Sequence, residues 1–501
     1  MSKTSFNLAV VSCDGLPVSG LLTILRNVLD LVHKNPDCPP MLNHPIAIDL
    51  GYSWRADKAA FFPSGPSYRQ FPDIFKLSQA VPVQFEGYNE FLLRIRNDVA
   101  RADVNMSAGD AEELRERIEA IAAPYQSYFE RWFEENDVDW VIAVNMTLSD
   151  GVPATTALHR AAERRWGSGS ARPGGVLFWD HDLFRSCSVW EQGQRIYPER
   201  PNAFTLLPSQ AWHRWAIVSE VLQQETAEYP TPMRAKLVPN VLPSIRRDRS
   251  PEFVDLLMRY LKTIDVHVAG DGDDWPMIFL VPVRTIPIKG ADVALRVFAA
   301  MTAVLRARGV DDFYLLIFGD LDEDAVHGAE LRALTAELNL DAHVRFLGGV
   351  PTYTFDTPTG PKLDETDLLA LCAMSHGGVL FTPKVPDVES VGLGPALAAT
   401  VGVPCLVSPF EAMRVVYGEE LSYIQLESLS PGSIIQGAEQ LVDLVLKNRA
   451  GNSAWQEAAA KNKTLMSTLF PDTEWKELLL ALAAEAGVAG DVVACARDAF
   501  F

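Results

Sequence analysis

Short apolar runs rich in β-branched residues alternate with longer helical patterns, such as Ala291–Arg308, along the whole chain. This alternation is typical of parallel sheets with helices on both faces, because each parallel strand is reached through a crossover helix. The strand-like runs are Asn7–Ser12, Ile46–Leu50, Trp140–Asn145, Val176–Trp179, Ile217–Ser219, Lys236–Val238, Ile278–Val283, Tyr314–Phe318, Val344–Leu347, Val379–Phe381 and Pro404–Val407. A chain of 501 residues is too long for one ordinary core. We therefore expect an α/β protein with two Rossmann-like domains facing a cleft.

A polar stretch rich in Arg and Asp separates the two groups of strand-like runs. The expected division is an N-terminal domain over 1–245, a linker over 246–275, a C-terminal domain over 276–465 and a C-terminal helical segment over 466–501. Within the linker, Asp271, Asp273 and Asp274 are interpreted as solvated charge. A loop-like stretch from Gly51 to Gln84 is rich in aromatic residues, which favours an ordered cover, although a plain hydrophobic patch fits nearly as well.

The charge balance is strongly acidic, with 65 acidic and 44 basic residues and a net charge of -21. Such a charge repels phosphate backbones and anionic lipid, so we expect neither nucleic acid nor a membrane surface as the principal partner. A small anionic ligand stays possible, because it responds to a few local cations.

The chain lacks a signal-peptide core and a run that could span a bilayer, which predicts a cytoplasmic protein without stable membrane insertion. The six scattered cysteines form no Cys-x-x-Cys pair, and several lie in apolar runs typical of reduced core residues.

The turn after the run Ile278–Val283 carries two cations. Arg284 follows the run directly, and Lys289 ends the same short loop before Gly290 and the next helical pattern. A guanidinium and an ammonium at a strand end can present two positive charges to a diphosphate. Ordinary surface cations are the alternative, and this segment alone leaves both interpretations open.

A second loop combines a glutamate with closely spaced glycines. The run Val379–Phe381 leads into a loop that contains Glu389 and Gly392–Gly394, and Pro395 fits the first turn of the following helix. Glycines let backbone amides approach a ligand closely, and a helix N-terminus adds positive potential. Glu389 lies where a carboxylate can accept hydrogen bonds from sugar hydroxyls. A solvated loop glutamate is the alternative.

Taken together, the two loops resemble those of retaining glycosyltransferases of family 4, which have the GT-B architecture of two Rossmann-like domains. The first loop resembles the family's Gly-Arg-Leu…Lys-Gly segment, and the second resembles its Glu-Gly-Phe-Gly-Leu…Pro…Gly-x-Pro segment. The resemblance implies that Arg284 and Lys289 hold the donor diphosphate and that Glu389 lies near the donor sugar. It also assigns donor binding to the backbone amides of Gly392, Leu393 and Gly394.

One position departs from the family pattern. The family's second glutamate, which typically binds the nucleotide ribose, falls on Leu397, and a leucine accepts no hydrogen bond. The identity of the nucleotide is therefore left open. The resemblance is specific over roughly Ile278 to Val416 and general elsewhere. In GT-B proteins a terminal helix crosses back to the first domain, and the helix around Trp475 to Ala486 could do so here.

The N-terminal half fits the family more loosely. Gly15 and Gly20 follow the first strand-like run, where the family has a glycine loop that contacts donor phosphate or acceptor. His181 ends another run, at a place similar to that of a histidine that contacts the transferred sugar in the family. Asp180 and Asp182 spell the Asp-x-Asp metal motif of the other large glycosyltransferase architecture. Because GT-B family members need no metal for the chemistry, we expect no metal site and no cofactor besides the nucleotide sugar as co-substrate.

The resemblance implies hexosyl transfer from a nucleotide-diphosphate sugar to a small-molecule or glycan acceptor, with retention at the anomeric carbon. Front-face substitution needs no protein nucleophile, so the protein orients the substrates and stabilises charge on the leaving group.

Two alternatives stay open. One is a sugar phosphorylase or epimerase on the same scaffold, which Leu397 permits because a phosphorylase needs no ribose partner. The other is a catalytically inactive nucleotide-sugar-binding subunit, although the retained Arg284, Lys289 and Glu389 argue against it. The acceptor, the donor sugar and the oligomeric state are not specified.

Overall fold

The chain forms two compact units in the computed structural model. The described residues are 3–12, 20–33, 40–54, 74–78, 82–102, 106–187, 189–191, 194–196, 200–245, 249–268 and 275–500. Unit 1 contains Met1–Pro17, Val28–Asn240 and Asp472–Phe501, and unit 2 contains Val18–Asn27 and Val241–Pro471. Gly15 and the three linker aspartates named above lie outside the described residues.

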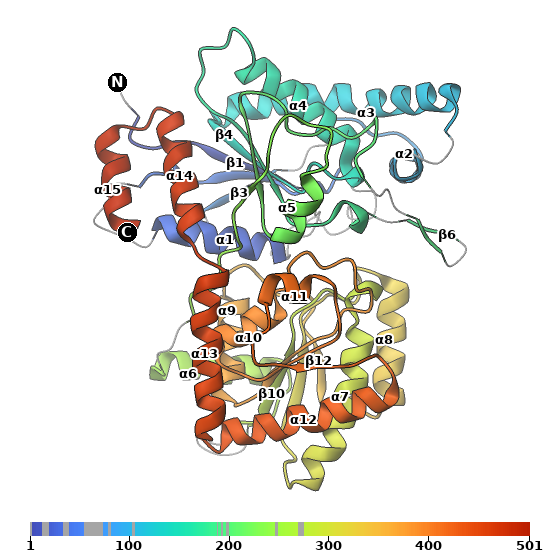
Figure 1. Cartoon of the computed structure of the whole chain (residues 1–501), viewed down its shortest axis with the longest axis vertical. Helices are drawn as coiled ribbons and strands as arrows, with labels where there is room; N and C mark the ends of the chain where they lie inside the picture. Colours follow the sequence, from blue (N-terminus) through green and yellow to red (C-terminus); the bar gives the residue numbers. More distant parts are fainter. Residues whose placement is uncertain are drawn as a thin grey trace. The chain divides into compact units, whose positions relative to one another are not determined.

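Unit 1 is built on a seven-stranded sheet in which every strand pair is parallel (Figure 1). In spatial order its strands are β3 (Phe75–Ser78), β2 (Ile46–Asp49), β1 (Leu8–Ser12), β4 (Trp140–Val144), β5 (Gly175–Asp180), β8 (His213–Ile217) and β9 (Lys236–Leu237). The central strands β1, β4 and β5 are buried along their whole length. Helices cover both faces of such a sheet, which is why these strands are nearly continuous apolar runs rather than alternating ones.

Most helices of unit 1 lie between its strands, and the last two follow all the strands of the chain. The helices are α1 (Gly20–His33), α2 (Tyr88–Arg101), α3 (Ala108–Glu135), α4 (Val152–Trp166), α5 (Glu220–Thr226), α14 (Thr473–Glu485) and α15 (Gly490–Phe500). The first part of α1 belongs to unit 2. Unit 1 also contains the short 3-10 turns η3 (Ser149–Gly151) and η4 (Phe184–Ser186) and a hairpin of β6 (Val189–Glu191) and β7 (Gln194–Ile196). The side chain of Ser107 caps α3 by accepting a hydrogen bond from the amide of Asp110 at 3.1 Å. Across the described residues, no helix has the length and apolarity to cross a bilayer.

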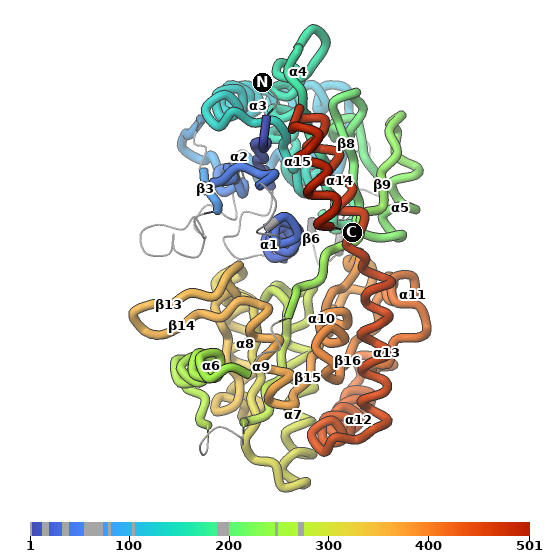
Figure 2. Tube along the Cα trace, turned by 90° about the vertical axis from the view of Figure 1, so that its left-hand side faces the viewer, coloured from blue at the N-terminus to red at the C-terminus, as the bar shows by residue number. Residues whose placement is uncertain are grey.

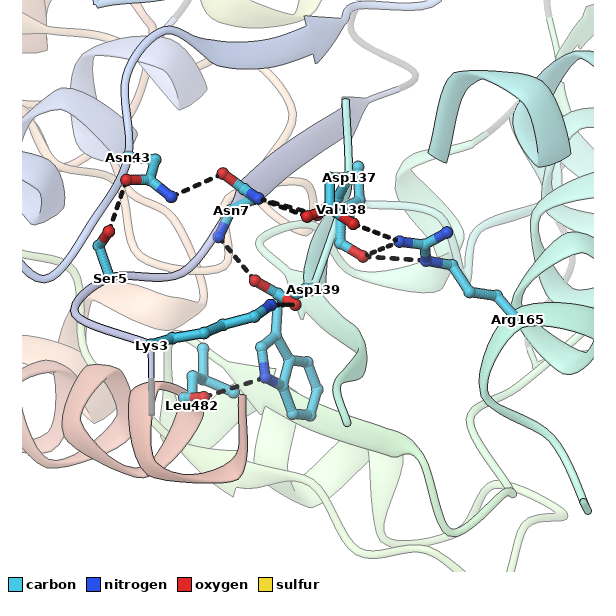
Figure 3. Close-up of polar contacts among 10 residues, drawn as sticks. Lys3, Ser5, Asn7, Asn43, Asp137, Val138, Asp139, Arg165 and Leu482 are labelled. Atoms are coloured by element: carbon cyan, nitrogen blue, oxygen red, sulfur yellow. Dashed lines mark hydrogen bonds and ion pairs between the residues drawn. The ribbon is translucent and has the colours of Figure 1, made fainter. Parts of the chain in front are cut away.

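Polar contacts join both chain ends to the amino edge of the unit 1 sheet (Figure 3). Lys3 Nζ lies 2.5 Å from Asp139 Oδ1, and the amide of Asn7 donates to Asp139 Oδ2 at 2.9 Å. Trp140 Nε1 donates to the carbonyl of Leu482 on α14 at 3.1 Å. Asp139 is only 4% exposed, so these partners replace the water that its carboxylate would otherwise need. The last two helices are thereby held in unit 1.

Unit 2 is built on a six-stranded sheet, again with parallel pairs only. In spatial order its strands are β12 (Val344–Phe346), β11 (Phe313–Ile317), β10 (Met277–Val281), β15 (Gly378–Phe381), β16 (Cys405–Val407) and β17 (Ile424–Gln425). Counted along the chain this is the doubly wound order of Rossmann folds. The order reverses between β10 and β15, which are direct neighbours. Ligands of such sheets bind beyond the carboxyl ends of the strands at the reversal.

The helices of unit 2 are α6 (Pro251–Thr263), η5 (Pro287–Lys289), α7 (Ala291–Ala307), α8 (Ala325–Glu337), α9 (Glu365–Met374), α10 (Gly394–Val401), α11 (Ala412–Tyr417), α12 (Pro431–Arg449) and α13 (Ser453–Leu469). The hairpin of β13 (Phe355–Thr357) and β14 (Gly360–Lys362) lies beside α6 (Figure 2). There Gly360 fits against α6 without a side chain, because a Cβ would meet Thr263 Oγ1 at 2.0 Å.

The predicted α/β fold with two parallel sheets is confirmed, and the structure corrects three details. The run Ile217–Ser219 is only the end of a strand that begins at His213, because Ser219 leaves the strand to cap α5. The stretch assigned to a linker contains α6, which starts beyond its cap Ser250 and belongs to unit 2. The long loop-like stretch after Gly51 includes the edge strand β3.

A half-buried histidine, His159, and a buried one, His213, face each other beside β5. The ring centroids of His159 on α4 and His213 on β8 lie 5.0 Å apart, and Phe178 packs against both rings. His213 Nδ1 accepts hydrogen bonds from the amides of Ser209 and Gln210, so the neutral ring carries its proton on Nε2. Burial lowers the pKa of His159 to about 3 and the pKa of His213 to about 4.

These histidines predict that unit 1 loses stability in acid. Between pH 6.5 and about 4 the unfolded chain binds protons that the folded rings exclude, so the free energy of unfolding should fall as the pH is lowered. His159→Phe should remove about 1.4 kcal/mol of this dependence per pH unit. Urea denaturation at a series of pH values measures both slopes. An unchanged slope in the variant would contradict this account.

Candidate functional site

The two loops singled out by the sequence leave adjacent strands at the reversal point of the unit 2 sheet. Residues 282–290 follow β10, and residues 382–393 follow β15. The register pairs Phe279 with Gly378 and Leu280 with Val379, so both loops emerge side by side from the carboxyl edge. The fold therefore places them where α/β sheets bind ligands.

Backbone contacts fix the two loops to each other. The amide of Lys384 donates to the carbonyl of Ile288 at 3.0 Å, and Thr382 Oγ1 donates to the carbonyl of Gly290 at 2.9 Å. Gly290 has a φ of 69°, and a Cβ there would stand 1.8 Å from the carbonyl oxygen of Thr382. Only glycine combines this left-handed conformation with such a close approach.

Lys289 and Glu389 meet across the two loops. Lys289 Nζ donates to Glu389 Oε1 at 2.7 Å. The side chain of Glu389 is 9% exposed and that of Lys289 is 23% exposed. A carboxylate so well buried needs a partner, and Lys289 provides it while keeping part of its ammonium accessible.

Arg284 is held by a different carboxylate. Its Nε donates to Glu323 Oε1 at 2.7 Å, and Nη2 contacts the same oxygen. Glu323 lies in the turn after β11, and its side chain is 3% exposed, against 33% for Arg284. Thr285 Oγ1 donates to the carbonyl of Asp320 in the same turn. The structure thus brings Lys289 to Glu389 but brings Arg284 to the neighbouring turn.

A third ion pair joins the second loop to the helix that follows the first loop. Lys384 Nζ is 3.0 Å from Asp292 Oδ2, on the first turn of α7. Arg284, Lys289 and Lys384 therefore each have a carboxylate partner. These pairs orient the three cations, and charge-assisted hydrogen bonds of this kind can also form with phosphate oxygens.

The glycines of the second loop are packed against aromatic rings. Gly392 has a φ of 66°, and a Cβ there would stand 2.6 Å from Phe410 Cζ. At Gly394 a Cβ would stand 2.5 Å from ring atoms of Phe381. Tyr417 donates its hydroxyl proton to the carbonyl of Gly392 at 2.8 Å. These contacts require glycine and hold the backbone in one conformation.

α10 begins directly after this loop. Its N-cap is Leu393, which provides no side-chain hydrogen bond to the first turn. The first amides of a helix need acceptors from outside the helix and carry positive potential, so this end favours an anion. Leu397 lies one turn further on and is 4% exposed.

His181 lies in unit 1, at the carboxyl end of β5. Its amide donates to Asn145 Oδ1 at 2.8 Å, and its ring centroid is 4.2 Å from that of Trp179. The side chain is 4% exposed. Burial lowers the pKa of His181 to about 3, so the ring is neutral at pH 7.

The two aspartates of the Asp-x-Asp motif have protein partners. Asp180 Oδ2 accepts a hydrogen bond from Trp215 Nε1 at 2.7 Å, and Asp182 Oδ2 accepts one from Asn145 Nδ2 at 2.8 Å. Burial raises the pKa of Asp180 to about 7. Over the described ranges, no group of three or more His, Cys, Asp or Glu side chains could hold a metal ion.

Gly20 is the first residue of α1 and is exposed. A Cβ at this position would meet nothing within 4 Å, so no steric reason demands glycine here. Gly20 belongs to the short stretch of α1 that is part of unit 2.

Sequence reasoning missed three residues of the site: Glu323, Lys384 and Asp292. Glu323 lies in the turn that follows β11, and Lys384 lies in the loop that follows β15. Both residues lie shortly after a strand-like run, and this position in the sequence could have indicated them as candidates. Their pairing could not be inferred, because each partner is supplied by a different strand-to-helix connection.

Comparisons with known proteins agree with this architecture. No family model matches the chain, and no curated protein matches it in sequence. The structure of Anabaena HepE in complex with UDP-glucose is similar, with a TM-score of 0.52 and 12% identity, covering 95% of this chain and 99% of that one. Sucrose-phosphate synthase from Thermosynechococcus elongatus is similar with a TM-score of 0.50 and 13% identity, covering 96% and 97%. These likenesses confirm the expected GT-B fold.

The close approach at Gly290 predicts a stability difference between the two ends of α7. Gly309, just beyond the other end of the helix, has a φ of 77°, but a Cβ there would meet nothing within 4 Å. Gly309→Ala should therefore cost about 1–2 kcal/mol, from backbone strain alone. Gly290→Ala should cost more, about 3 kcal/mol or above, because it adds the collision with Thr382. Urea denaturation compares the two, and equal losses would contradict the collision.

Proposed function

We propose that this protein is a retaining glycosyltransferase, of hexosyltransferase type, that uses a nucleotide-diphosphate sugar as donor and a small molecule or glycan as acceptor. The observation that carries the proposal is the meeting of Lys289 with Glu389 at the reversal point of the unit 2 sheet. A cation suited to a diphosphate and a carboxylate suited to sugar hydroxyls lie there within one hydrogen bond.

The proposed role of each residue in donor binding follows from the chemistry of its side chain or backbone. Arg284 and Lys289 bind the donor diphosphate, and the amides of residues 392–394 add hydrogen bonds at the start of α10. Glu389 accepts hydrogen bonds from the donor sugar. Glu323 holds the guanidinium of Arg284 in place before the donor arrives.

The proposed reaction is a front-face substitution. The bond between the anomeric carbon and the phosphate oxygen breaks, and the acceptor oxygen bonds to the same face of that carbon. The departing phosphate takes the acceptor proton. Negative charge grows on the leaving group, so preoriented cations and amides stabilise the transition state more than the ground state. We assign this stabilisation to the protein groups and propose no metal and no cofactor besides the donor.

Residues outside this centre have proposed roles as well. His181 is proposed to contact the transferred sugar, and its neutral ring would act as a hydrogen-bonding group rather than as a cation. Gly15 and Gly20 are proposed to contribute to donor binding. The choice of donor class is supported by HepE, whose structure was solved with UDP-glucose.

A second candidate follows from Leu397. Its buried side chain stands where the family's ribose-binding glutamate would be, and a sugar phosphorylase or epimerase on this scaffold needs no such partner. Turnover that requires inorganic phosphate and no nucleotide would favour the phosphorylase. Failure of the purified chain to form any product while it still binds a nucleotide sugar would favour an inactive binding subunit.

A thermal-shift screen of nucleotide sugars tests the proposal directly. A donor raises the melting temperature by mass action, by an amount that grows with its concentration relative to Kd. We expect a shift with at least one nucleotide sugar, and product formation when acceptors are then supplied. A screen without any stabilising nucleotide sugar or nucleoside diphosphate would refute the donor assignment.

Lys289→Ala should lower turnover roughly a hundredfold, because it removes one preoriented charge from the leaving-group site. The substitution also leaves Glu389 without Lys289, so the double variant Lys289→Ala/Glu389→Gln separates the two effects. We expect the double variant to stay inactive. Recovery of activity there would show that Lys289 only neutralises Glu389. Lys362→Ala, on the exposed part of β14, is the matched control and should keep its activity.

Leu397→Glu should strengthen nucleotide binding by roughly tenfold, since a carboxylate that accepts a ribose hydroxyl contributes about 1.5–3 kcal/mol. Calorimetric titration with the nucleoside diphosphate of the identified donor measures the change. Leu397→Met keeps the buried apolar contacts and is the control. Unchanged or weaker binding by a folded Leu397→Glu variant would show that the ribose does not reach this position.

A further inference from the structure

A cavity of about 380 Å³ lies in unit 2 where α9, α10 and α13 converge. Small residues create the space, because Ala370 and Ala373 of α9 and Ala459 and Ala460 of α13 line it. Its size falls within the range of about 300–1,000 Å³ found for small-molecule sites. The lining is mostly apolar, which suits a ligand with a hydrocarbon body.

The cavity is separate from the centre at the carboxyl edge of the sheet. It is lined by Val401 and Gly402 at the C-terminal end of α10, whereas Gly392–Gly394 lie at the other end of that helix. A helix of this length spans about 12 Å. The cavity therefore has no part in the donor site proposed above.

The charges around the cavity are unusual for so acidic a chain. Arg249 and Lys463 line it, and no Asp or Glu of the described residues does. Neither cation forms an ion pair with another described residue, whereas the three cations at the carboxyl edge are all paired. Burial lowers the pKa of His376, and the nearby Arg449 and Arg249 lower it further.

The helix ends around the cavity offset only part of this charge. Met374 ends α9 and Val401 ends α10, and both residues line the cavity. Each C-terminus is equivalent to about half a negative charge, so together they offset roughly one of the two cations. Among the charges that line the cavity, about one positive charge is left without compensation. A ligand with a single negative charge would complete the balance.

We infer that this cavity binds a small monocarboxylate, with its carboxylate between Arg249 and Lys463 and its apolar body against the alanines of α9 and α13. The inference does not depend on the glycosyltransferase proposal, because none of these residues belongs to the donor site. It assigns the chain a second small-molecule site.

Calorimetric titration of the full-length protein with octanoate tests the inference, with octanamide as the neutral probe of the same shape. We expect octanoate to bind at a single site and octanamide to bind at least about tenfold more weakly, as one charge-assisted contact requires. Lys463→Gln should weaken octanoate binding by roughly tenfold. Ala459→Phe, which fills the cavity, should abolish it.

Lys461→Gln is the matched control. Lys461 lies on the same helix but pairs with Glu420 at 3.2 Å and does not line the cavity, so octanoate binding should be unchanged. Equal affinity for octanoate and octanamide would overturn the inference, as would wild-type affinity in Lys463→Gln. Absence of octanoate binding throughout the millimolar range would overturn it as well. Lys463→Gln changes one half-buried polar side chain, so the test stands even if Ala459→Phe does not fold.

Discussion

The approach of Gly290 to the carbonyl of Thr382 is the contact on which the centre of unit 2 depends. A Cβ at position 290 would stand 1.8 Å from the carbonyl oxygen of Thr382. The loop after β10 can therefore pack this closely against the loop after β15 only if residue 290 is glycine. This approach brings the neighbouring Lys289 within hydrogen-bond distance of Glu389. It also positions the start of α7, because Gly290 is the N-cap of that helix. Two strand-to-helix connections are thereby joined by backbone hydrogen bonds and close packing.

Electrostatics at this centre differ from those of the chain as a whole. The chain carries a net charge of -21, yet the carboxyl edge of unit 2 contains three cations, each paired with a carboxylate. Glu323 and Glu389 are nearly buried, so their charges would be costly without these partners. The pairs fix the directions of the cations in advance, which is what stabilisation of a charged leaving group requires. Under the proposed function, an incoming diphosphate would compete with these carboxylates for the cations.

Unit 1 uses its buried polar groups differently. His159, His181 and His213 are kept neutral by burial, and Asp180 has its pKa raised towards neutrality. The three histidines are therefore neutral near pH 7, whereas unit 2 gathers ion pairs at its carboxyl edge. The contrast is consistent with the proposed donor site in unit 2. The role of His181 in that chemistry is still a prediction.

The sequence by itself determined the elements whose cause is local. Continuous apolar runs predicted the buried parallel strands, and the glycines at 392 and 394 predicted a loop of close backbone approach, because both depend on residues near one another in the chain. The end of β8 was misjudged because Ser219 serves a helix cap rather than the strand. Only the tertiary structure decided which charges meet. Lys289 and Glu389 are 100 positions apart, and their contact follows from β10 and β15 being neighbours. Strand order is set by packing of the whole sheet, which no local pattern encodes.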